Sequence, residues 1–209
     1  MQIAILLYDG MTALDAVGPA QVLAGLPGTR LAWVAQAPGA KHTDCGVSLV
    51  ADHSLDEVLR PDVVLVPGGV DVRPVMRDER TLGWLRTVHA TSQWTTSVCT
   101  GALVLAAGGL LRGLRATTHW SVRDRLRDFG AEPVDERIVR EGKVITAAGV
   151  SAGIDMALRL VELIAGERAA QIVQLLIEYD PAPPFQAGSP RTAPAEVVTA
   201  ARQLLGAAD

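Results

Sequence analysis

The sequence contains little of several residue types, and each shortage excludes a class of protein. Only two of its 209 residues are cysteine, which is too few for the disulfide framework of a small secreted domain. We therefore expect a cytoplasmic, reducing setting. One of the two, Cys45, lies between turn residues and a short strand and is interpreted as an incidental thiol. Aromatic residues make up 4% of the chain, so Val, Leu, Ile and Ala have to build the core.

Basic clusters and long apolar runs are also missing. The formal net charge is −4 and charges of both signs are interspersed, which predicts neither a nucleic-acid partner nor a polybasic membrane anchor. No apolar run reaches the roughly 18 residues that a membrane-spanning helix needs, because Gly108 and Gly109 interrupt the best candidate. The apolar start, residues 1–7, lacks the positive leader and cleavage pattern of a secretory signal, so we interpret it as a first strand.

What the chain does contain is an alternation of short apolar runs with segments of helical spacing. The runs predict buried strands at Gln2–Tyr8, Arg30–Ala35, Val47–Ala51, Asp62–Val66, Thr95–Val98 and Lys143–Ala147. The segments of helical spacing are Ala13–Leu26, Glu79–Thr91, Ser121–Phe129 and Ser151–Ala165. This alternation predicts an α/β fold: a doubly wound, mostly parallel sheet with helices on both faces. Two β runs around Glu141-Gly142 add a small β-hairpin over residues 137–147.

The organisation of the chain predicts one domain over residues 1–209. This length suffices for one well-buried core, and neither an internal repeat nor a second domain is visible. Towards the end, proline becomes too frequent for a helix, so residues from about 180 to 193 are expected to form an extended arm over the surface. A last amphipathic helix is expected at residues 194–206.

Cys99 stands at the junction between the predicted strand Thr95–Val98 and a predicted helix, Thr100–Ala107. Ligands of such sheets bind outside the carboxyl ends of the strands, so this thiol is a candidate nucleophile. The motif SVCTG matches a nucleophile elbow in part, since it keeps the final glycine, Gly101. We expect a strained backbone at this corner and a thiol pKa lowered by the helix N-terminus. The position alone leaves a second interpretation open, a buried core cysteine.

Two further segments point to the same strand ends. After the run VLVP, the backbone amides of Gly68 and Gly69, with that of Thr100, are predicted to form a nest for developing negative charge. The PGG motif by itself is equally typical of a tight turn. Asp15 lies early in a predicted helix among apolar residues, which favours a carboxyl that keeps its proton and acts as an acid. An acidic residue at such a place also often serves as a helix cap.

Three smaller observations complete the predicted site. Gly18-Pro19 is expected to interrupt the hydrogen-bond ladder of the helix just after Asp15, which suggests a shaped site. A short strand in ATTHW ends at His119, which makes this histidine a second-tier pocket candidate, although a lone histidine is more often structural. Trp120 is predicted to form a wall of the pocket.

Five motifs occur together in chain order: LDAVGP, VPGG, SVCTGALVLAAGGLL, ATTHW and GVSAGIDMAL. In this combination the chain resembles the ThiJ/PfpI superfamily, and within it the isonitrile hydratase group and the amino-terminal domains of AraC-type regulators. The resemblance implies a flavodoxin-like fold related to class I glutamine amidotransferases, and a homodimer. It also implies that Cys99 is the nucleophile, Asp15 its acidic partner and Thr100 a further catalytic residue.

The residue after the cysteine separates groups within the superfamily. Protease-like members carry histidine there, whereas Thr100 matches the isonitrile hydratases, so a peptidase is disfavoured. A complete AraC-type regulator is not expected either, because the sequence shows no helix-turn-helix region.

The predicted activity is therefore that of a hydro-lyase. Cys99 adds to the terminal carbon of an isonitrile, Asp15 supplies the proton, and water releases an N-substituted formamide from a covalent thioimidate. We expect a small-molecule substrate and neither a metal nor an organic cofactor. Two alternatives stay open, a cysteine-based redox or electrophile sensor and a non-catalytic small-molecule-binding module. Glyoxalase-type aldehyde chemistry is a third choice.

Overall fold

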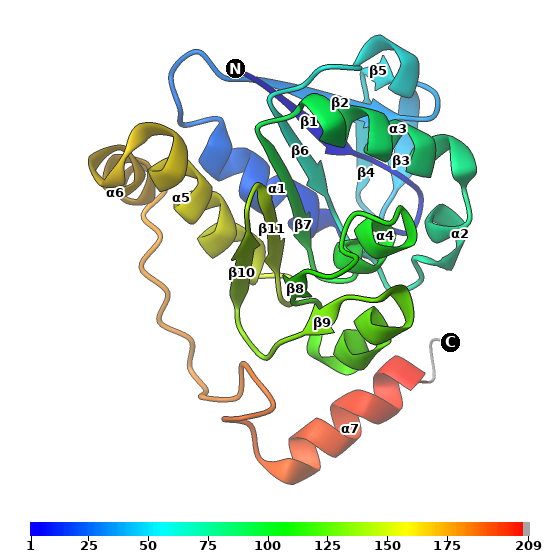
Figure 1. Cartoon of the computed structure of the whole chain (residues 1–209). Helices are drawn as coiled ribbons and strands as arrows, with labels where there is room; N and C mark the ends of the chain where they lie inside the picture. Colours follow the sequence, from blue (N-terminus) through cyan, green and yellow to red (C-terminus); the bar gives the residue numbers. More distant parts are fainter. Residues whose placement is uncertain (207–209) are drawn as a thin grey trace.

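A computed structural model describes residues 1–206 of the chain, and it contains the predicted α/β architecture (Figure 1). A central sheet has the strand order β10-β11-β7-β6-β1-β2-β5, in which only β10 runs antiparallel to its neighbour. The strands of this sheet are β1 (Gln2–Leu6), β2 (Arg30–Ala35), β5 (His53–Ser54), β6 (Val63–Val66), β7 (Trp94–Val98), β10 (Ile138–Glu141) and β11 (Val144–Ala147). The fold is thus flavodoxin-like and mostly parallel, as the sequence predicts.

Helices cover both faces of this sheet, because its strands bury side chains on both sides. Along β1, Ile3 and Ile5 face one apolar cluster with α1 and α5, whereas Ala4 and Leu6 face a second cluster with α3 and α4. The helices are α1 (Ala13–Leu23), α2 (Arg73–Met76), α3 (Glu79–Thr91), α4 (Gly101–Ala107), α5 (Ala152–Ala165), α6 (Glu167–Leu176) and α7 (Ala195–Gly206). The two clusters make the sheet a rigid platform for the loops at its strand ends.

Two small sheets and two 3₁₀ segments complete the described chain. They are β3 (Gly39–His42) with β4 (Ser48–Ala51), β8 (Arg115–Ala116) with β9 (Glu132–Pro133), η1 (Leu55–Glu57) and η2 (Trp120–Phe129). The hairpin predicted around Glu141-Gly142 is formed by β10 and β11, and Gly142 has the positive φ of 59° that its turn requires.

Several predicted elements differ from the structure. The run Val47–Ala51, predicted to be a buried strand, forms β4, which pairs with β3 outside the main sheet and buries only Ala51. The segment Ser121–Phe129, predicted to have helical spacing, lies in the 3₁₀ helix η2. Only Leu126 is buried there, so no apolar face of α-helical spacing packs against the core. The helix that follows α5 directly after Gly166, α6, was not predicted.

The predicted interruption at Gly18-Pro19 affects only the hydrogen-bond ladder, since α1 continues through Pro19 to Leu23. Proline lacks a backbone N–H, so one hydrogen bond, to the carbonyl of Asp15 four residues earlier, is absent while the flanking turns remain helical. Packing of α1 against α5 maintains the helix at this point, because a Cβ on Gly18 would already lie 3.2 Å from Ile154.

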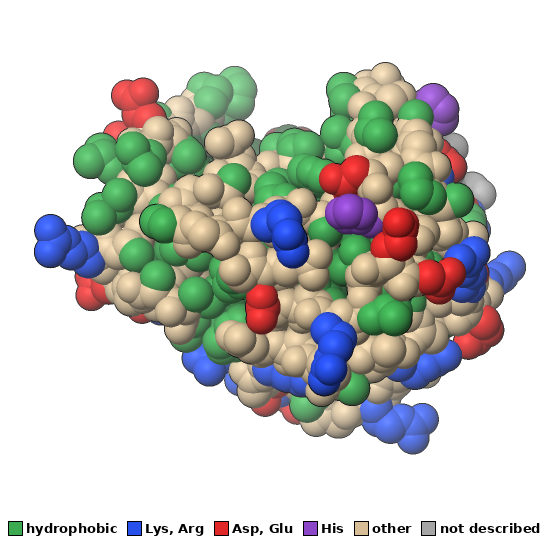
Figure 2. Space-filling view, turned by 90° about the horizontal axis from the view of Figure 1, so that it is seen from above, with side chains coloured by type: hydrophobic (Ala, Val, Ile, Leu, Met, Phe, Trp, Pro, Cys, Tyr) green, Lys and Arg blue, Asp and Glu red, His purple; other side chains and the backbone are tan. Residues whose placement is uncertain are grey.

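The end of the described chain runs away from the sheet. Residues between α6 and α7 form neither helix nor strand, and they carry α7 to the region of η2 (Figure 1). On the face seen in Figure 2, acidic and basic side chains are interspersed among apolar ones. Within residues 1–206, no helix is long and apolar enough to cross a membrane.

Candidate active site

Cys99 occupies the corner between β7 and α4, as predicted, and its backbone is strained. Its φ is +56°, a left-handed value that non-glycine residues rarely adopt. Three hydrogen bonds hold it there: the Cys99 N–H donates to the carbonyls of Ala147 (3.1 Å) and Ala148 (2.7 Å), and the Thr118 hydroxyl donates to the Cys99 carbonyl (2.7 Å). The sheet therefore fixes the direction of the thiol.

Gly101, the first residue of α4, cannot be replaced by a larger residue without a steric clash. A Cβ on Gly101 would lie 2.2 Å from the carbonyl oxygen of Val66, at the end of the neighbouring strand β6. No side chain fits at that distance, so α4 starts in direct contact with the backbone of β6. This close approach brings the loop after β6 next to Cys99.

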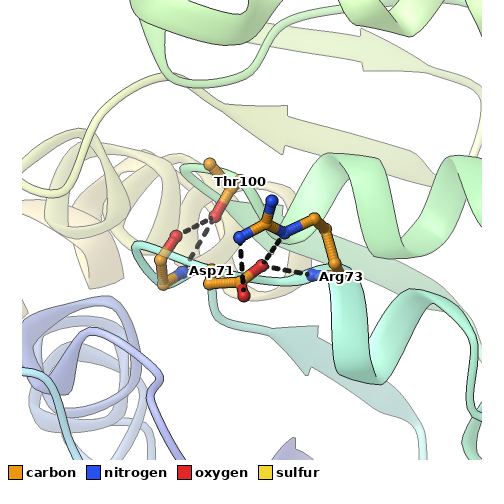
Figure 3. Close-up of polar contacts among 4 residues, drawn as sticks. Asp71, Arg73 and Thr100 are labelled. Carbon is orange, nitrogen blue, oxygen red and sulfur yellow. Dashed lines mark hydrogen bonds and ion pairs between the residues drawn. The ribbon is translucent and has the colours of Figure 1, made fainter. Parts of the chain in front are cut away.

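The loop Pro67-Gly68-Gly69 binds the other two predicted catalytic residues. The Gly68 N–H donates to Asp15 Oδ2 (2.9 Å). Thr100 Oγ1 accepts from the Gly69 N–H (2.8 Å) and donates to the Gly69 carbonyl (2.8 Å), as Figure 3 shows. Asp15, Cys99 and Thr100 thus meet at one strand-end site, although they come from three separate segments.

These contacts correct two predicted roles. The amides of Gly68 and Gly69 are already bound by Asp15 and Thr100, so they are not free to stabilise charge on a substrate. The Thr100 hydroxyl gives its single proton to the Gly69 carbonyl, so this side chain holds the loop in place instead of acting as a further catalytic residue. The backbone amides that form hydrogen bonds with the Cys99 sulfur are those of Thr100 and Val150. Val150 was not predicted as a site residue.

An ion pair stiffens the same loop further along the chain. The guanidinium of Arg73 donates to both carboxylate oxygens of Asp71 (2.7 and 3.0 Å), and the Arg73 backbone N–H donates to Asp71 Oδ1 (3.0 Å) (Figure 3). This pair joins the loop after Gly69 to the first residue of α2. It was not predicted, because a local Asp-x-Arg sequence carries no signal of its place beside a site.

Asp15 has the electrostatics of an acid that keeps its proton. Its side chain is completely buried, and Oδ1 has no hydrogen-bond partner among residues 1–206. Burial, with a smaller contribution from the carboxylate of Asp44, raises its pKa to about 7, although the Gly68 N–H and the Cys99 thiol both act to lower the pKa. This direction agrees with the sequence prediction of a carboxyl held neutral by apolar surroundings.

Cys99 differs from its prediction in ionisation. Burial raises the pKa of its thiol to about 12, and the nearby Asp15 carboxyl adds to the shift, whereas the amides of Thr100 and Val150 lower it. The expected lowering by a helix N-terminus is outweighed because the side chain is only 5% exposed and α4 is a short helix of seven residues. At neutral pH the resting site therefore holds a thiol, not a thiolate.

The thiol is nevertheless not sealed in the core. It opens into a cavity of about 420 Å³ that Thr100, His119 and Val150 also line, with Asp44 on one side and Arg202 of α7 on another. Burial lowers the pKa of His119, and its Nδ1 is paired with Ser121 Oγ (2.7 Å), so this ring is uncharged at neutral pH.

Trp120 lies behind this wall instead of forming it. It is absent from the cavity lining, and its ring packs beside that of His119 with 5.5 Å between the centroids. The guanidinium of Arg202 lies over the Trp120 ring, 4.9 Å from its centroid. Its predicted place in the pocket is therefore corrected to a support for two lining residues.

Among residues 1–206, no group of three or more His, Cys, Asp or Glu side chains is arranged to hold a metal ion.

The sequence and the fold of this chain are similar to those of known proteins. The family model "DJ-1/PfpI family" matches residues 1–163. The chain belongs to the DJ-1/PfpI family. An isonitrile hydratase from Pseudomonas putida is 47% identical over 205 residues, which cover 97% of this chain and 89% of that protein. The crystal structure of a ThiJ/PfpI family protein from Pseudomonas syringae superposes with a TM-score of 0.96 at 42% identity, covering 98% of this chain and 86% of that one.

More distant members of the DJ-1/PfpI family have other activities or domains. A glutathione-independent glyoxalase from Caenorhabditis elegans is 28% identical over 58% of this chain and 66% of its own length. The transcriptional regulator CdhR from Pseudomonas aeruginosa is 30% identical over 60% of this chain but only 38% of the regulator. Because these relatives differ in their named activities, membership of the family does not by itself assign a reaction to this chain.

Proposed function

We propose that this protein hydrates isonitriles to N-substituted formamides through a covalent intermediate on Cys99. The observation that carries the proposal is a thiol that keeps its proton and opens into the cavity, next to a fully buried carboxyl with a pKa of about 7. The 47% identity to a protein named isonitrile hydratase supports the choice of substrate.

The first step suits a thiol that keeps its proton. The terminal carbon of an isonitrile carries a lone pair and becomes an electrophile once it is protonated. Asp15 gives its proton to this carbon, the Cys99 sulfur bonds to the same carbon, and the thiol proton passes to Asp15. The net change is addition of S–H across one carbon, which gives the thioimidate Cys–S–CH=N–R.

Water completes the reaction without another reactant. It adds to the thioimidate carbon while the nitrogen takes a proton, which gives Cys–S–CH(OH)–NH–R. The C–S bond then breaks, the hydroxyl proton returns to sulfur, and the formamide HC(=O)–NH–R leaves. The amides of Thr100 and Val150 stabilise negative charge on the departing sulfur, and the Thr100 hydroxyl keeps the Gly69 loop in place.

The raised thiol pKa argues against the alternative of a redox sensor. Oxidation of cysteine by peroxide proceeds through the thiolate, and burial suppresses that form at neutral pH. Proton transfer within the Cys99–Asp15 pair, by contrast, requires that both groups hold exchangeable protons.

The test is formation of formamide by the purified protein. Cyclohexyl isonitrile is added, and the expected product, N-cyclohexylformamide, is followed by liquid chromatography and mass spectrometry. Cys99→Ala is expected to lose all measurable turnover, whereas Cys45→Ala, which removes the exposed second thiol, keeps the wild-type rate. Equal turnover by Cys99→Ala and wild type would exclude covalent catalysis at this residue.

We also propose that the protein is a homodimer in solution, as the family resemblance implies. Light scattering coupled to size-exclusion chromatography tests this directly. A mass of 44 kDa, twice the 22.0 kDa of the chain, is expected, and a mass of 22.0 kDa at micromolar concentration would contradict it.

A further inference from the structure

One wall of the cavity around Cys99 comes from a distant part of the sequence. α7 contributes Arg202 and Leu205 to the lining, whereas the thiol itself is placed by β7 and α4. Figure 1 shows α7 brought to this place by the long irregular segment that follows α6. Side chains of α7 therefore help to decide which substituent fits beside the thiol.

Arg202 is the positively charged residue in the described lining, and Asp44 is the negatively charged one. Within residues 1–206, no carboxylate lies within ion-pair distance of the Arg202 guanidinium. Its contact is instead the face of the Trp120 ring, 4.9 Å from the centroid. Because no described residue offers it a carboxylate, this guanidinium has hydrogen-bonding capacity available toward the cavity.

Stacking on Trp120 prepares this guanidinium to bind an anion. The ring covers one face of the planar group, but the N–H donors lie in its plane and point outward from the edge. Stacking also reduces the number of side-chain conformations, so less entropy is lost when two of these donors bind both oxygens of a carboxylate.

Asp44 gives the cavity wall a negative charge in addition to the positive charge of Arg202. Its Oδ2 accepts a hydrogen bond from the Thr12 hydroxyl (2.5 Å), which holds this carboxylate on the side of the β3–β4 turn. An anionic group on a substrate is repelled there and attracted toward α7. The isonitrile carbon then lies at Cys99 and the anionic end at Arg202.

We propose that Arg202 determines specificity by binding a carboxylate on the substituent of the isonitrile. The preferred substrates are then short isonitriles that end in a carboxylate, a class narrower than isonitriles in general. This inference rests on the proposed function, because it places the reacting carbon of the substrate at Cys99.

Matched pairs of substrates test the proposal. Isocyanoacetate, 3-isocyanopropanoate and 4-isocyanobutanoate are each compared with the corresponding methyl ester, which has the same skeleton without the charge. We compare wild type with Arg202→Gln and calculate the fall in kcat/KM separately for each substrate, so that intrinsic reactivity cancels. Arg168→Gln, an exposed arginine on α6, controls for the loss of one positive charge elsewhere.

For the acid of optimal length, Arg202→Gln is expected to reduce kcat/KM about 10- to 100-fold more than for its ester, the range for a charged hydrogen bond. Arg168→Gln is expected to alter acid and ester alike. Equal falls for acid and ester in Arg202→Gln would overturn the proposal, because they would mean that Arg202 only supports α7.

A binding experiment separates this proposal from the proposed function. Calorimetry measures the affinity of the matching ω-formamido acids, which are the expected products, for wild type and Arg202→Gln. Weaker binding by the variant supports the anion site even when no isonitrile is turned over, in which case the proposed function alone fails. Unchanged affinity overturns the anion site whatever the turnover.

Discussion

At the scale of single residues, the site depends on two buried groups whose pKa values are both raised by the fold. Removal from water raises the pKa of Asp15 to about 7 and that of Cys99 to about 12. The order of these values matters, because Asp15 is the group whose protonation changes within the ordinary working range. Asp15 therefore sets the pH dependence of the proposed reaction.

The pH profile of turnover follows from the acid role of Asp15. Only the protonated carboxyl donates to the isonitrile carbon, so kcat/KM is expected to be highest below pH 7 and to fall as the pH rises through about 7. Initial rates with a neutral isonitrile between pH 5 and 9 measure this. A rate that increases through pH 7 would instead identify Asp15 as a base.

Asp15→Asn separates catalysis from stability. The variant keeps the shape but has no proton to donate, so kcat/KM is expected to fall at least about 100-fold. Above pH 7, the free energy of unfolding of the variant is expected to be higher than that of wild type. Folding raises the Asp15 pKa from 3.8 to about 7, so the free energy of unfolding of wild type decreases as the pH rises across that window, by up to about 4 kcal/mol.

Thermal melting at two pH values checks the second half of this prediction. At pH 8, Asp15→Asn is expected to melt several degrees above wild type, because the variant has no buried charge to form. At pH 3 this advantage largely disappears, since wild-type Asp15 is then mostly protonated in both the folded and the unfolded chain. A variant less stable than wild type at pH 8 would show that the carboxylate is stabilised in the fold.

At the scale of elements, the contact between the start of α4 and the end of β6 builds the corner. Gly101→Ala places a methyl group 2.2 Å from the Val66 carbonyl oxygen. This is expected to reduce the free energy of unfolding by more than about 2 kcal/mol and to reduce turnover by displacing Cys99.

Gly83→Ala is the matched control for Gly101→Ala. Gly83 lies inside α3, where an added Cβ meets nothing closer than the end of Arg86, at 3.8 Å. This substitution is expected to stabilise the chain by about 0.5–1 kcal/mol, because alanine has the higher helix propensity. Denaturant unfolding measures both variants. Equal stability of the two would contradict the steric account of the corner.

Most elements could be predicted from local pattern, and the errors have physical causes. Fully apolar runs such as Asp62–Val66 indicate strands buried on both faces, and β6 is one. The run that forms β4 has similar composition, but it pairs with β3 in a separate hairpin, and pairing partners are not readable from one segment. Likewise Pro19 weakens a helix locally, while the packing that maintains α1 comes from α5, far along the chain.

At the scale of the whole molecule, the predicted site residues are those that the parallel sheet brings together at the ends of its strands. Cys99 and Thr100 follow a strand, and Asp15 lies in the first turn after another, so the parallel sheet brings them to one edge. Val150 and Arg202 reach the cavity through a loop and a distant helix, and no local signal marks them. The thiol pKa was also mispredicted, because burial is a property of the complete fold.

The central claim, that Cys99 forms a bond to the isonitrile carbon, is tested most directly by trapping the intermediate. Protein in excess is mixed with an isonitrile, quenched in acid at intervals, and digested for peptide mass spectrometry. The account predicts a transient mass increase equal to the whole isonitrile, located on the peptide that contains Cys99 and decaying as formamide appears. Formamide produced at the full rate by Cys99→Ala, or an adduct found only on Cys45, would contradict it.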